Sequence, residues 1–143
     1  MAGEGREGQC AWLAAAVAVR RLGDAATSEA MVAERHDRSW MLLFKGQNSV
    51  ACTLFRTTPF AAHRTGVPRP RLRGWLLGAA PPGVYVVRGD HHCATVDTTT
   101  TAPVLDDGGE LQPLSEESIA RTLGDVVEVA RVEPKKRPRA GAE

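Results

Sequence analysis

The feature that most constrains the fold is an apolar run near the N-terminus. Residues 10–22 read CAWLAAAVAVRRL, with apolar side chains around the whole circumference of a helix. A helix that is hydrophobic on every face belongs in the interior of a protein, and this one is too short to span a bilayer. Gly23, which follows the paired arginines and Leu22, suits a helix C-terminal cap. The sequence therefore predicts a buried central helix beginning at Cys10, after a flexible segment of residues 1–9.

The second half of the chain has the pattern of a β-sheet. Two β-rich runs flank the turn at Arg88, Gly89 and Asp90, and together they predict a hairpin. Ser115 is a good helix N-cap and Gly124 a good stop. The remaining predicted helices cover residues 29–36 and 72–77, and the predicted strands cover residues 84–87, 93–96, 103–105 and 126–132. Residues 40–44 read as a buried strand or a short turn of helix. Helices first and strands second indicate an α+β domain over residues 10–132.

The charges and cysteines narrow the partners and the compartment. A net charge of +1 argues against a membrane or nucleic acid as the main partner. Three widely spaced cysteines do not form a disulfide framework, so reduced thiols and a cytoplasmic location are expected. Residues 133–143 read as a disordered tail, in which the basic run from Lys135 to Arg139 resembles a nuclear localisation signal. A second basic stretch contains Arg64, Arg69, Arg71 and Arg73.

Cys10 is the candidate nucleophile, because it stands at the predicted start of the buried helix. The positive end of the helix dipole and the free backbone N–H groups there favour thiolate over thiol. The same N–H groups can hold a developing oxyanion. A buried cysteine acting as a small hydrophobe is the more common case, so a base must be found elsewhere in the chain.

Histidines stand where the second strand of the hairpin begins, at His91 and His92. A histidine at the first position of a strand is held rigidly and can face a helix N-terminus. The next predicted strand ends in Asp106, whose carboxylate can accept a hydrogen bond from the imidazole and fix its tautomer. Asp107 is the alternative carboxylate. Cysteine, histidine and aspartate at the edges of predicted elements fit an activated nucleophile with an oriented base.

The segments GQCAW, HHCATVD and VLDDG resemble the papain-like cysteine peptidases in the broad sense. That superfamily includes small bacterial effector and bacteriocin-processing peptidases, viral leader proteases and compact deubiquitinases. The resemblance implies a papain-like α+β fold, with an N-terminal central helix packed on a C-terminal antiparallel β-sheet. It assigns Cys10 as nucleophile, His92 as base in preference to His91, and Asp106 as the orienting carboxylate.

The same resemblance implies an enzyme that hydrolyses peptide or isopeptide bonds without a cofactor or metal. The substrate is then a polypeptide, either a polyprotein junction or a ubiquitin-like protein. A glutamine upstream of the nucleophile helps to build the oxyanion site in the family, and Gln9 is the candidate here.

Two other kinds of protein fit parts of the sequence. Zinc binding has enough ligand types in His91, His92 and Cys93, with Cys10, Cys52 or His63 as further ligands. The close ligand pairs of structural zinc sites are missing, however, and adjacent residues on a strand point to opposite faces. The stronger alternative is an inactive protein-interaction domain of the same fold, which contacts nucleic acid through its basic segments.

Overall fold

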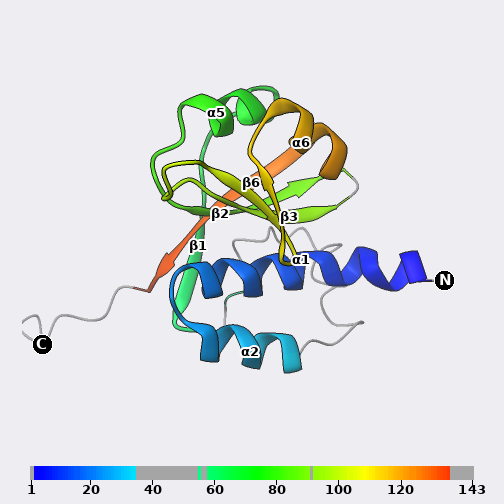
Figure 1. Ribbon diagram of the computed structural model, residues 1–143, viewed down its shortest axis with the longest axis vertical. Coiled ribbons are helices and arrows are strands. Elements are labelled where there is room, and N and C mark those ends of the chain that lie inside the picture. The colour runs from blue at the N-terminus through cyan, green and yellow to red at the C-terminus, as the bar shows by residue number, and fades with distance from the viewer. Residues whose placement is uncertain (1, 35–54, 56–57, 91, 136–143) are drawn as a thin grey trace, which may run out of the picture.

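The computed structural model describes residues 2–34, 55, 58–90 and 92–135 of the chain, and its strands form one antiparallel sheet (Figure 1). The six described strands lie in the order β1-β6-β2-β3-β4-β5. Their bounds are β1 Phe60–Arg64, β2 Val84–Gly89, β3 Cys93–Asp97, β4 Val104–Asp107, β5 Glu110–Pro113 and β6 Val126–Pro134. The helices are α1 Ala2–Arg21, α2 Ala25–Glu34, η1 Arg69–Arg71 (a 3-10 turn), α5 Leu72–Gly78 and α6 Glu116–Thr122. The α+β class predicted from the sequence is confirmed.

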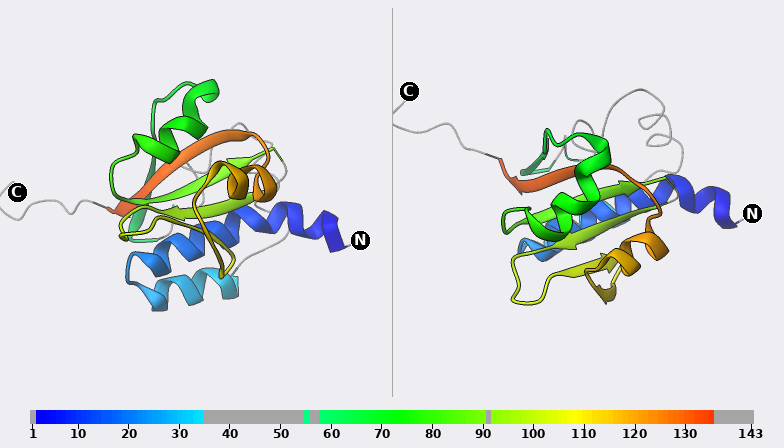
Figure 2. Two further views of the ribbon diagram at one scale, coloured as in Figure 1. Left: turned by 45° about the horizontal axis from the view of Figure 1, so that its top comes forward. Right: turned by 90° about the horizontal axis from the view of Figure 1, so that it is seen from above.

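The helices cover both faces of the sheet. Helix α1 lies along one face with α2 packed outside it, while α5 and α6 lie on the opposite face (Figures 1 and 2). Two separate hydrophobic clusters result, one between α1 and the sheet and one between the sheet and the pair α5 and α6. None of the described helices is both long and apolar enough to cross a membrane.

Helix α1 is the buried central helix that its composition predicted. Residues 14–19 are buried without interruption, because the sheet covers one side of the helix and α2 the other. Buried hydroxyl groups tie the three elements together. Thr95 Oγ1 donates to the carbonyl of Ala14 over 2.7 Å, and Ser28 Oγ donates to the carbonyl of Ala16 over 2.6 Å. After α1, Gly23 has a φ of 101° and provides the expected C-terminal cap.

The start of α1 differs from the prediction. The helix begins at Ala2 rather than at Cys10, so residues 2–9 are helical where a flexible segment was expected. Ala2 is a strong helix former. Each glycine in this stretch costs about 1 kcal/mol, but extending a helix that already exists avoids the cost of nucleation.

Most predicted elements of the second half are confirmed, with some differences at their ends. The hairpin of β2 and β3 and the helix capped by Ser115 are present, and β6 extends past the expected boundary to Pro134. The backbone N–H of Lys135 also donates to Pro59, so the predicted disordered tail does not begin at Glu133. Strands β1 and β5 were missed. The strand or helical turn expected at residues 40–44 lies outside the described residues.

Candidate functional site

His92 and Asp107 form the pair that most resembles a catalytic base with its orienting carboxylate. His92 ends the tight turn between β2 and β3, where its carbonyl accepts a hydrogen bond from Gly89 N over 2.7 Å. Asp107 ends β4, directly before the positive-φ turn of Gly108 and Gly109. His92 Nε2 and Asp107 Oδ1 lie 2.7 Å apart, and the two side chains are 32% and 30% exposed. A carboxylate at this distance holds the orientation of the ring and its tautomer.

Asp106, the carboxylate preferred in the sequence prediction, is bound to other groups than His92. Its side chain is 1% exposed, and its Oδ2 accepts a hydrogen bond from Arg21 over 2.8 Å. Its Oδ1 accepts from Gly109 N over 2.8 Å. Successive residues of a strand point to opposite faces, so Asp106 faces α1 while Asp107 faces away from it. The expected contact between His92 and Asp106 is therefore wrong, and Asp107, the alternative, is the aspartate that contacts the ring.

Arg21 binds two buried carboxylates, a cluster that the sequence did not indicate. Its Nε lies 2.7 Å from Asp97 Oδ2 and its Nη1 lies 2.8 Å from Asp106 Oδ2. Burial raises the pKa of Asp97, but hydrogen bonds from Thr99 and Arg21 outweigh it and hold that pKa below its ordinary value. Hydrogen bonds to Asp97 and Asp106 likewise outweigh the burial of Arg21 and raise its pKa. The cluster fastens the C-terminal end of α1 to β3 and β4, which is a structural role.

Cys10 lies inside α1 and not at its start, as the ninth residue of a helix that begins at Ala2. Only the first four N–H groups of a helix lack a partner within it. The expectation that Cys10 is surrounded by free backbone N–H groups is therefore wrong. The side chains of Cys10 and Gln9 are outside the described part of the structure, as is His91. The predicted contact of about 4 Å between the Cys10 sulfur and His92 falls outside it as well.

The course of α1 nevertheless brings the Cys10 turn to the end of the sheet where His92 lies. Ala14 contacts Thr95 and Arg21 contacts Asp97, so α1 and β3 run in the same direction. Cys10 precedes Ala14 by about 6 Å of helix, and the first residue of β3 precedes Thr95 by about 6.6 Å of strand. The backbone of Cys10 is therefore opposite the beginning of β3, next to His92 in sequence.

Side chains along β3 alternate between the two layers, as predicted. Cys93 is 4% exposed and packs in the cluster with α1, whereas Ala94 and Val96 belong to the cluster with α5 and α6. Asp107 points to the face of the sheet that α5 and α6 cover. The contact between His92 and Asp107 thus joins the β2–β3 turn to the β4–β5 turn at one end of the sheet.

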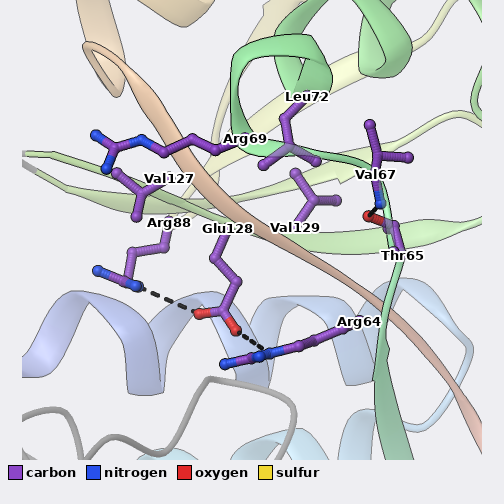
Figure 3. A pocket seen from close by; sticks show the side chains of 10 residues that line it. Arg64, Thr65, Val67, Arg69, Leu72, Arg88, Val127, Glu128 and Val129 are labelled. Carbon is purple, nitrogen blue, oxygen red and sulfur yellow. Dashed lines mark hydrogen bonds and ion pairs between the residues drawn. The ribbon is translucent and has the colours of Figure 1, made fainter.

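A second polar site surrounds Glu128 of β6 (Figure 3). Glu128 is 8% exposed, and its two carboxylate oxygens each lie 3.2 Å from a guanidinium nitrogen, one of Arg64 and one of Arg88. These residues line a hollow of about 340 Å³ together with Arg69 of η1. The sequence had singled out Arg64 and Arg69 as basic residues, but it did not connect them with Glu128 or Arg88, which are far away along the chain.

No group of three or more His, Cys, Asp or Glu side chains within the described ranges could hold a metal ion. Comparison with known proteins found no matching family model, no matching curated protein and no matching solved structure.

Proposed function

We propose that this chain is a papain-like cysteine peptidase in which Cys10 is the nucleophile, His92 the base and Asp107 the orienting carboxylate. The observation that carries the proposal is the 2.7 Å contact between His92 Nε2 and Asp107 Oδ1, with about a third of each side chain exposed. A structural ion pair in the core does not need to be exposed to solvent, whereas a catalytic base must be accessible to the substrate. The parallel course of α1 and β3 brings the Cys10 backbone to the same end of the sheet. Because Asp107 faces the side opposite α1, the proposal requires the Cys10 thiol to meet the ring of His92 around that end of the sheet.

The chemistry follows from the roles of these groups. With Nε2 of His92 bonded to Asp107, the Nδ1 atom takes the thiol proton of Cys10. The thiolate attacks the carbonyl carbon of a peptide or isopeptide bond, and the protonated His92 returns the proton to the leaving amine. Water, deprotonated by His92, then hydrolyses the thioester and releases the thiol. The substrate is a polypeptide, either a polyprotein junction or a ubiquitin-like protein, and the cytoplasm keeps the thiol reduced.

The reactivity of the thiol tests the proposal without knowledge of the substrate. Native protein is treated with iodoacetamide over a range of pH, and alkylation is followed at each cysteine by mass spectrometry. We expect Cys10 to react faster than Cys52 and Cys93, with a midpoint below the free-thiol pKa of about 8.5. His92→Ala should move that midpoint back toward about 8.5, because the thiolate loses its imidazolium partner.

A matched histidine controls for general effects of the substitution. His63 is 61% exposed on β1 and lies 3.5 Å from Glu133, so His63→Ala should leave the Cys10 midpoint unchanged. On fluorogenic peptide and ubiquitin-amide substrates, His92→Ala should lower kcat/KM by at least about 100-fold. Cys10→Ala should abolish turnover, and the double variant should be no worse than Cys10→Ala. A Cys10 midpoint at or above about 8.5 in the folded protein contradicts the proposal.

The second candidate function is an inactive protein-interaction domain of the same fold. The position of Cys10 within the hydrogen-bonded body of α1 favours it, because a helix N-terminus can no longer help to form the thiolate. For such a domain we expect slow alkylation of Cys10 in the folded protein, with a midpoint at or above the free-thiol pKa of about 8.5.

A further inference from the structure

One edge of β6 is not covered by any strand that the structure describes. Strand β1 pairs with β6 only as far as Arg64 opposite Ala130, and the chain then leaves the sheet. Strand β6 continues back to Val126 with β2 on its other side. The strand edge formed by residues 126–129 is called the β6 edge below. Along such an edge, alternate residues direct their N–H and C=O groups outward, where another strand can pair with them.

The hollow beside Glu128 follows this edge. Three consecutive residues, Val127, Glu128 and Val129, line it. Because neighbouring strand residues point to opposite faces, a cavity that touches all three must run along the backbone edge. Figure 3 shows Glu128 directed toward α1, with Val127 and Val129 on the side of Leu72. The lining therefore combines peptide groups with apolar surface, as a groove for an extended chain requires.

The hollow is also cationic. Arg64, Arg69 and Arg88 come from three separate elements, and Glu128 is the one carboxylate among its described lining residues. Arg64 and Arg69 have side chains that are 63% and 57% exposed, so their guanidinium groups can reach a ligand. Asp125 approaches Arg69 only to 3.7 Å and is itself 70% exposed. A smaller adjacent hollow is lined by Arg69 and Arg73 together with the carboxylate of Asp125.

We propose that the β6 edge, with Arg64, Arg69 and Arg88, binds an acidic polypeptide segment in an extended conformation as an additional strand. Guanidinium groups bind carboxylates through paired, charge-assisted hydrogen bonds, and the strand edge supplies the backbone pairing. No aromatic side chain belongs to the described lining, and nucleic acids without aromatic partners lose base stacking. A peptide therefore matches this surface better than a nucleic acid.

This docking surface goes beyond the peptidase proposal and needs no catalysis. Binding is measured with Cys10→Ala protein, by fluorescence anisotropy of a short labelled peptide of alternating Glu and Val. We expect saturable binding that the matched peptide of alternating Lys and Val does not show. Methylating the backbone nitrogens on one edge of the peptide removes its N–H donors there. Of the two possible edge-methylated peptides, one should bind about tenfold more weakly than the parent, because its strand pairing is lost.

Substitutions in the protein locate the binding site. The double change Arg64→Gln with Arg69→Gln should weaken binding about tenfold, as two partly exposed ion pairs are lost. Arg121→Gln is the matched control: this arginine is 59% exposed on α6, outside the hollow, and its loss should leave Kd unchanged. Unfolding in urea is recorded for each variant to show that it is folded.

Four results would overturn the inference. They are equal binding of the lysine peptide, an unchanged Kd in the double variant, undiminished binding of both edge-methylated peptides, and displacement of the peptide by a tighter-binding single-stranded oligonucleotide. The last result would identify the surface as a nucleic-acid site. Because Cys10 is absent from the protein used, none of these outcomes depends on whether the chain is a peptidase.

Discussion

The cluster around Arg21 allows a sharp test of how the central helix is fastened to the sheet. Arg21→Met keeps the length of the side chain but removes the cation from between Asp97 and Asp106, whose side chains are 4% and 1% exposed. Removing one partner of a buried ion pair costs about 3–5 kcal/mol. Each carboxylate keeps another donor, Thr99 N for Asp97 and Gly109 N for Asp106. The side chain of Arg21 is also 20% exposed, so we expect the lower end, about 3 kcal/mol.

The pH dependence of this loss follows from the charges. The lowered pKa of Asp97 means that its contribution to stability is present above its ordinary pKa of 3.8 and disappears as the pH falls through the lowered value. In Arg21→Met, the buried Asp97 carboxylate loses its cation, which raises the pKa of Asp97 and favours its protonated form. The difference between the two proteins should therefore be largest near neutral pH and shrink below about pH 4.

Urea unfolding at several pH values measures this difference as a change in midpoint at constant slope. Arg20→Met is the matched control, because Arg20 is the exposed neighbour and makes no described contact with either aspartate. It should lose less than about 0.5 kcal/mol. A loss below about 1 kcal/mol for Arg21→Met at neutral pH, or a loss that does not change with pH, would refute the reasoning.

Five further substitutions test packing and capping. In Gly89→Ala the new Cβ would lie 2.0 Å from the carbonyl oxygen of Leu123, so the backbone must move and about 2–3 kcal/mol should be lost in urea unfolding. Gly83→Ala meets only the side chain of Arg131, at 3.0 Å, and should cost clearly less. Ser115→Ala removes the acceptor for Ser118 N and should cost about 1 kcal/mol, seen as a lower Tm. Trp12→Ala removes a half-buried ring whose N–H donates to the Met31 carbonyl, and it should cost about 3 kcal/mol of unfolding free energy. Cys10→Ala should cost no more than about 1–2 kcal/mol. Equal losses for these last two variants would place Cys10 in the packed core.

Sequence reasoning worked best where a local rule decides the structure. The apolar circumference of residues 10–22 predicted a buried helix, and Gly23 marked its C-terminal end, as the structure confirms for residues 14–19 and for the positive φ of Gly23. Strand β1 was missed because its five residues, FAAHR, are short and carry no clear alternation. Pairing with β6 stabilises β1 as a strand, and the local sequence does not indicate that pairing.

At the candidate site, local sequence patterns did not predict which side chains contact each other. Composition and order along the chain by themselves determined the α+β class, the buried central helix, and a histidine at a strand entrance followed by a pair of aspartates. Only the tertiary structure decided which aspartate meets His92, because strand pairing sets the face to which each residue points, and the hairpin register turns Asp106 to Arg21 and leaves Asp107 for the ring. The same holds for Arg64, Arg88 and Glu128, whose charges meet only after three strands distant in sequence have paired.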